Sequence, residues 1–198
     1  DIFAPKRYPG DGAYSDTDTI RYGIIESFEE IIWDRKSDYS FKEALLPISD
    51  TIMYFTQSST KLPEPRKKRL LFLRSCDIHA LKRLDEIYLK NGFSDYYYQS
   101  VRENAKFVLM GCADSFNSCF CVSMGTNQTD SYDAYAYPET NGLYFEFNNE
   151  DLKTAAKASE APEESFPKRF VTVNGAQGCP PESLPENIGQ HELWKAYS

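Results

Sequence analysis

The sequence predicts a mixed α/β domain in which a partly parallel central sheet is flanked by helices. The first observation is a pair of short, continuous apolar runs of the kind that form buried strands, residues 69–73 and 106–110. The second is the stretch between them, where apolar residues follow Asp77 at helical spacing and end at an Asn-Gly pair. Strand, helix and strand make a βαβ unit over residues 69–112, so we expect its two strands to be parallel.

The other elements are predicted from shorter patterns. Apolar residues recur at helical spacing over residues 18–33, which predicts an amphipathic helix there. Ser40 and Glu43 have the spacing of a capping box and predict a short helix that ends at Pro47. The second half of the chain is expected to hold a hairpin of strands at residues 132–137 and 143–147, a helix at 150–158, an acidic loop at 159–165 and a strand at 171–173.

We expect one α/β domain over residues 1–174, followed by an irregular linker and a helix over residues 175–198. Gly and Pro interrupt the chain over residues 175–185, which favours an irregular segment. The sequence begins with Asp1-Ile2-Phe3, without an initiator Met or a signal-peptide pattern, so we interpret it as trimmed from a longer protein.

Composition narrows the functional classes. Aromatic residues make up 15% of the chain, which favours a folded domain with an aromatic-rich core. Lys and Arg number 22 against 30 Asp and Glu, a net charge of −8 that repels phosphate and excludes a nucleic-acid partner. No apolar run approaches the ~18 residues of a spanning helix, so no membrane association is expected. The odd count of five cysteines favours a reducing compartment, the cytoplasm.

Four cysteines are expected to meet at one edge of the sheet. Cys76 follows the first strand of the βαβ unit and Cys112 follows the second. The carboxyl ends of parallel strands share one edge, where open α/β sheets bind their ligands. Cys119 and Cys121 come shortly after Cys112 in the same loop region, so we expect all four thiols on one rim.

Four thiols in one place predict either an iron-sulfur cluster of the [4Fe-4S] type or a zinc ion, because soft sulfur donors suit both. Zinc sites usually contain C-x2-C knuckles, which this sequence lacks, so the wider spacing favours a cluster. Inert core cysteines and a redox disulfide at the C-x-C pair remain alternatives. Loop thiolates near a surface would lose a cluster to oxygen.

Two further residues are poorer candidates for ligands. His79 is expected to be a solvated helix histidine, and Cys179, before two prolines, a turn residue. The chain holds no Ser/His/Asp arrangement, paired-acid motif or phosphate-binding glycine loop, so no catalytic residue is predicted and no self-contained active site.

Several segments carry a resemblance to a known family. They are Arg74-Ser75-Cys76-Asp77-Ile78, Leu84-Asp85, Tyr97-Tyr98, Arg102 and, most specifically, residues 117–126 with the run Cys-Phe-Cys-Val-Ser-Met. Supporting matches occur at residues 3–6, 14–18 and 40–43. These segments resemble the iron-sulfur A-subunit family of anaerobic sulfite reductase, a pattern shared with the beta subunits of cytoplasmic nickel-iron hydrogenases, or sulfhydrogenases. Asn127 and Thr129-Asp130 look more like the sulfite reductase branch.

The resemblance implies an electron-transfer iron-sulfur subunit of a multi-subunit oxidoreductase. Its partners would be a flavin subunit that oxidises NAD(P)H and a sirohaem subunit that reduces sulfite to sulfide. In the family, a ferredoxin-like segment with two further [4Fe-4S] clusters follows, and residues 191–197 resemble the helix that leads into it. The assignment of the four cysteines as cluster ligands rests on their spacing and on the sheet topology alone, and not on the resemblance. The alternatives are a metal-free docking or scaffold domain and the beta subunit of a hydrogenase.

Overall fold

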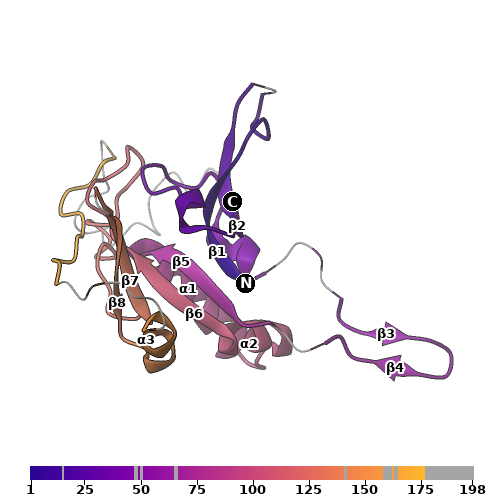
Figure 1. Ribbon diagram of the computed structural model, residues 1–198. Helices are drawn as coiled ribbons and strands as arrows, with labels where there is room; N and C mark the ends of the chain where they lie inside the picture. Colours follow the sequence, from indigo (N-terminus) through magenta and orange to yellow (C-terminus); the bar gives the residue numbers. More distant parts are fainter. Residues whose placement is uncertain are drawn as a thin grey trace, which may run out of the picture.

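A six-stranded mixed sheet forms the centre of the protein (Figure 1). The structure, a computed structural model, describes residues 1–14, 16–46, 49, 51–64, 67–140, 142–157, 162 and 165–176. The strands are β1 (Ile2–Tyr8), β2 (Thr19–Ile24), β3 (Tyr54–Phe55), β4 (Thr60–Lys61), β5 (Arg69–Arg74), β6 (Ala105–Met110), β7 (Ala134–Glu139) and β8 (Gly142–Phe147). The helices are α1 (Ser75–Leu89), α2 (Tyr96–Glu103) and α3 (Glu150–Ala156), with short 3-10 helices η1 (Phe28–Glu30) and η2 (Phe41–Ala44).

The strand order is β2-β1-β5-β6-β7-β8, and its centre is parallel. β5 pairs with β6 in parallel along its whole length, from Arg69 opposite Ala105 to Arg74 opposite Met110. β1 with β5 and β6 with β7 are also parallel, whereas β1 with β2 and β7 with β8 form antiparallel hairpins. The mixed fold and the βαβ unit over residues 69–112 are therefore confirmed.

Side chains of the central strands alternate between two cores, as the period of two requires. On one face Leu71, Leu73 and Leu109 pack with the buried sides of α1 and α2. On the other face Phe72 and Val108 pack with the segment after β2 and with α3. The two strands are apolar on both sides because both faces of the sheet are covered.

Local capping explains where α2 begins. The Asp95 side chain accepts from the Tyr98 backbone N–H at 2.7 Å and starts α2. The ring of buried Tyr98 stacks on Tyr88 of α1, with centroids 4.9 Å apart, and its hydroxyl donates to Asp85 at 2.7 Å. These contacts join α1 to α2 under the sheet.

Two sequence predictions are wrong. Residues 18–33 are not a helix: β2 occupies the first part and pairs with β1 from Tyr8 opposite Thr19 to Phe3 opposite Ile24. The spacing of the isoleucines fits the period of a helix and also that of a strand, and pairing with β1 decides in favour of the strand. Residues 171–173 form no strand, because the carbonyl groups of Val171 and Val173 accept hydrogen bonds from loop side chains.

The other short elements agree with their patterns. The hairpin of β7 and β8 and helix α3 are confirmed, and η2 is capped by Ser40, whose hydroxyl accepts from the Lys42 N–H at 3.4 Å. Most of the predicted acidic loop, Cys179 and the helix at residues 191–197 lie outside the described residues. Within the described residues, no helix is long and apolar enough to cross a membrane.

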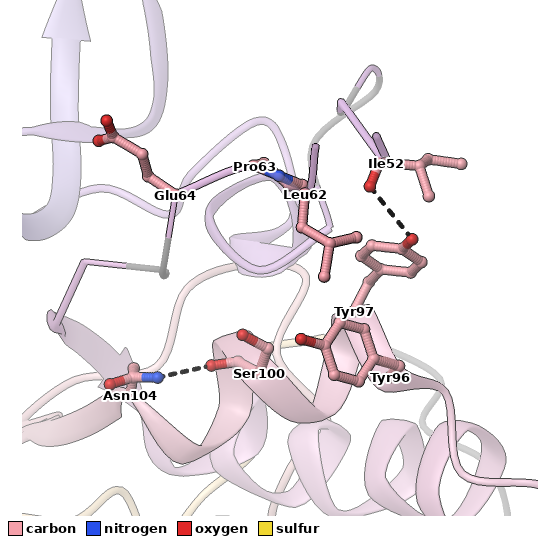
Figure 2. A pocket seen from close by; sticks show the side chains of 8 residues that line it. All are labelled: Ile52, Leu62, Pro63, Glu64, Tyr96, Tyr97, Ser100 and Asn104. Carbon is pink, nitrogen blue, oxygen red and sulfur yellow. Dashed lines mark hydrogen bonds between the residues drawn. The ribbon is translucent and has the colours of Figure 1, made fainter. Parts of the chain in front are cut away.

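A small hairpin, β3 and β4, extends away from the main sheet (Figure 1). It exposes Tyr54 and Phe55 to solvent. A cavity of about 300 Å³ lies between its flanking residues and α2, next to a hydrogen bond from the Tyr97 hydroxyl to the Ile52 carbonyl (Figure 2). Asn104 lines this cavity just before β6 begins, so the cavity lies at the amino edge of the parallel strands.

Candidate functional site: a thiol edge on the parallel sheet

Cys76, Cys112, Cys119 and Cys121, here called the thiol edge, follow the carboxyl ends of β5 and β6. Cys76 is the second residue of α1, directly after β5, and Cys112 lies two residues beyond β6. Because Arg74 pairs with Met110 in parallel register, the two strands end level with each other. The predicted common edge for Cys76 and Cys112 is thus confirmed.

Each of the four thiols interacts electrostatically with at least one other. Cys112 and Cys121 both act on the Cys76 thiol, and Cys112 and Cys119 both act on the Cys121 thiol. All four cysteines are free and half-buried, so no disulfide joins them. The C-x-C pair therefore forms no disulfide, and the four cysteines as joint ligands of one cluster stay a prediction.

Burial favours the protonated form of the Cys76 and Cys121 thiols when no metal is bound. It raises the pKa of Cys76 to about 12, and the nearby Asp77 carboxylate adds to the effect. Burial also raises the pKa of Cys121, with a smaller contribution from Cys119. A metal that binds here must displace these protons, so metal uptake is favoured by higher pH.

Backbone and side-chain hydrogen bonds tie the cysteine loop to residues 169–176. The Cys119 carbonyl accepts from the N–H groups of Gly175 and Ala176, each at 2.9 Å. The Asn174 side chain accepts from Val122 N–H at 3.0 Å and donates to the Ser123 hydroxyl at 2.6 Å. The loop is thus held at both ends of the C-x-C pair.

Close backbone approach requires glycine at two positions beside the thiols. A Cβ on Gly175 would lie 2.6 Å from the Phe116 carbonyl carbon. A Cβ on Gly111, just before Cys112, would lie 2.6 Å from the Tyr137 ring and 2.9 Å from Cζ of Tyr135. These glycines allow the loop and the sheet to pack tightly around the cysteines.

Three polar residues at the edge complete the site. Arg74 donates to Cys112 Sγ at 3.2 Å from a buried position. The Ser75 hydroxyl is buried and has no hydrogen-bond partner among the residues that the structure describes. His79, predicted from the sequence to be merely solvated, donates from Nε2 to the Gln128 carbonyl at 2.8 Å and so joins α1 to the loop. Arg74 was not predicted from the sequence. The signal that could have found it is a charged residue at the end of an otherwise apolar strand.

Thiol donors are the kind that both iron-sulfur clusters and zinc take. No three His, Cys, Asp or Glu side chains in the described ranges are grouped to hold one metal ion. A four-iron cluster takes one thiolate on each of its irons, so its ligands lie farther apart than those of one zinc ion. The unpartnered Ser75 hydroxyl next to Cys76 offers a donor to such a cluster.

Comparison with known proteins identifies one relevant relative. No family model matches the chain, and no solved structure matches it. The chain is 30% identical over 127 residues to sulfhydrogenase 2 subunit beta of Pyrococcus furiosus. The match covers 63% of this chain and 37% of the relative, little more than a third of its length. The chain is therefore a distant homologue of a sulfhydrogenase beta subunit, and the match does not single out the sulfite reductase branch.

Proposed function

We propose that this chain is an electron-transfer module of a multi-subunit oxidoreductase and that its thiol edge binds one [4Fe-4S] cluster. The observation that carries the proposal is the common carboxyl edge that the free thiols Cys76 and Cys112 share after β5 and β6, with the C-x-C pair in electrostatic contact with them through Cys121. This edge is where parallel sheets bind ligands, and thiolates are the donors that iron-sulfur clusters take. Similarity to one subunit of a sulfhydrogenase supports the same interpretation.

When bound, the cluster would supply one-electron transfer, and the chain supplies its surroundings. Cys76 is placed by the first turn of α1 and Cys112 by the end of β6. Cys119 and Cys121 sit on a loop that Asn174 and Gly175 fasten. Two ligands would thus come from regular elements of the sheet layer and two from an anchored loop. The half-buried position limits access of water and oxygen.

Two complexes are candidates for the whole assembly. The finer proposal is an anaerobic sulfite reductase, in which electrons pass from a flavin subunit that oxidises NAD(P)H to a sirohaem subunit. The alternative is a nickel-iron hydrogenase, favoured by the identity of the relative. Asn127 donates to the Val171 carbonyl at 2.8 Å, and the Thr129 hydroxyl accepts from Ser131 N–H at 3.3 Å. Both residues fold the loop, so they do not decide between the branches.

Assay of the native complex separates these branches. The complex containing this chain is purified anaerobically and supplied with reduced methyl viologen and either sulfite or protons as acceptor. Sulfide production from sulfite supports the sulfite reductase assignment, and hydrogen evolution without sulfite reduction replaces it with the hydrogenase assignment.

Iron counting on cysteine variants tests the cluster itself. The full chain is reconstituted anaerobically with iron and sulfide, and both are measured per chain. Wild type and Cys179→Ser, the matched control, should each hold about four irons, whereas Cys112→Ser and Cys121→Ser should lose them. Retention of iron by Cys112→Ser with loss in Cys179→Ser would place the site elsewhere. A wild-type chain that binds only zinc would have a zinc site in place of a cluster. A wild-type chain that binds no metal would be a scaffold domain.

A further inference from the structure

Arg74 carries a charge in a buried position beside the thiol edge. It is the last residue of β5 and is only 7% exposed. A guanidinium stays protonated inside a protein, so its burial is costly unless hydrogen bonds and negative charge compensate. The preceding buried residues of β5 are apolar, so packing alone does not explain an arginine here.

Four contacts fix the guanidinium in place. Nη2 donates to the carbonyl groups of Trp33 at 2.9 Å and Arg35 at 3.3 Å, on the segment after η1. Nη1 donates to Cys112 Sγ at 3.2 Å, and Cζ lies 4.7 Å from the centroid of the Phe116 ring. The group therefore bridges the 33–35 segment and the cysteine loop.

The charge of Arg74 has no carboxylate bonded to it in the described part of the chain. Asp77 is the buried acid nearby, but its Oδ2 accepts from the backbone N–H of Arg74 at 3.4 Å and from the Tyr22 hydroxyl at 3.3 Å. The guanidinium is directed instead at the sulfur of Cys112. Its natural counter-charge is a thiolate at the thiol edge.

We infer that Arg74 positions Cys112 and donates an N–H···S hydrogen bond to a cluster bound there, which raises the reduction potential of that cluster. The inference rests on the proposed function. A reduced cluster carries one more negative charge than the oxidised cluster. A fixed positive charge and a hydrogen bond to a ligand sulfur therefore stabilise the reduced form more. Because the side chain is already fixed by Trp33 and Phe116, it needs no rearrangement when the electron arrives.

The test compares Arg74→Gln and Arg74→Lys with wild type. Each full chain is reconstituted anaerobically, its iron is counted, and its midpoint potential is measured by a redox titration followed by electron paramagnetic resonance. Both variants should retain the cluster, since Arg74 is not a ligand. Arg74→Gln should lower the ratio of reduced to oxidised cluster about tenfold at the wild-type midpoint, or 59 mV for one electron. Arg74→Lys keeps the charge and should show a smaller shift in the same direction.

The matched control is Arg102→Gln. Arg102 is also a partly buried arginine over an aromatic ring, Phe107 at 4.9 Å, but it pairs with Asp85 and contacts no thiol in the described part of the chain. Its potential should equal that of wild type. An equal shift in Arg102→Gln, unchanged potentials in both Arg74 variants, or loss of iron from both would overturn the inference. If Arg74→Gln does not fold, Arg74→Lys carries the test.

The outcome also separates this inference from the proposed function. A wild-type chain that takes up no cluster refutes the proposed function, and the inference with it. A wild-type chain that binds the cluster at the same potential as both Arg74 variants refutes only the role of Arg74.

Discussion

The substitution Gly111→Ala tests the close packing that places Cys112. Gly111 is buried between β6 and Cys112, and its N–H donates to the Ala136 carbonyl at 2.9 Å. An added Cβ would meet the Tyr135 hydroxyl, with Tyr137 Cδ2 at 2.6 Å. Tyr135 cannot move aside easily, because it is fully buried and its hydroxyl accepts from Arg169 N–H at 2.7 Å.

The expected loss of stability follows from two opposing contributions. Overpacking a buried site costs about 1–3 kcal/mol. Replacing glycine by alanine reduces the entropy of the unfolded chain and returns about 0.4–1 kcal/mol. The net loss of about 1–2 kcal/mol should lower the Tm of a chain of 198 residues by about 2–8 °C.

A double-mutant cycle with Tyr135→Phe identifies the contact responsible. Tyr135→Phe alone should cost about 1 kcal/mol, because it removes the acceptor for Arg169 N–H. It also removes the hydroxyl that the new methyl group would meet. The stability loss of the double variant should therefore be smaller than the sum of the two single losses by about 0.5 kcal/mol or more. Thermal unfolding of the metal-free chains by circular dichroism measures all four. An unchanged Tm in Gly111→Ala, or strict additivity, would refute the packing argument.

Three further substitutions are predicted. Asn174→Ala removes the side-chain contacts to Val122 and Ser123, so a reconstituted cluster should lose iron several-fold faster to a chelator than wild type; an equal rate would contradict the anchoring role. Glu30→Gln should lower the Tm at pH 7, because Lys6 and backbone N–H groups lower the pKa of Glu30 to about 2. That difference should be complete above pH 4.5 and shrink as the pH falls towards 2, and a difference that grows with acid would be opposite in sign. Tyr98→Phe removes the hydrogen bond to Asp85 and should cost about 1 kcal/mol in urea unfolding, whereas no change would show that the bond contributes nothing.

The sequence predicts the part of the fold that places Cys76 and Cys112, because local signals are strong there. Two apolar runs and a capped helix determine the βαβ unit, and parallel pairing then puts both cysteines on one edge. The helix predicted over residues 18–33 is wrong because isoleucine spacing alone does not separate a helix from a strand. Only the pairing of β2 with β1, a contact between distant parts of the chain, decides between them.

The surroundings of the thiols could not be predicted in the same way. Arg74 reaches Trp33 and Cys112 across about forty positions, and no local pattern signals such a contact. Asn174 and Gly175 hold the cysteine loop from a segment whose sequence pattern is irregular. Contacts made by single polar side chains over long separations appear only once the fold has assembled them.

The presence of a redox-active cluster on the thiol edge is tested most directly by electron paramagnetic resonance. The full chain is reconstituted anaerobically, reduced with dithionite, and compared with Cys112→Ser treated in parallel. We expect a signal of about one unpaired spin per wild-type chain and none in the variant. A wild-type chain without this signal, or a variant that retains it in full, would contradict a cluster at the thiol edge.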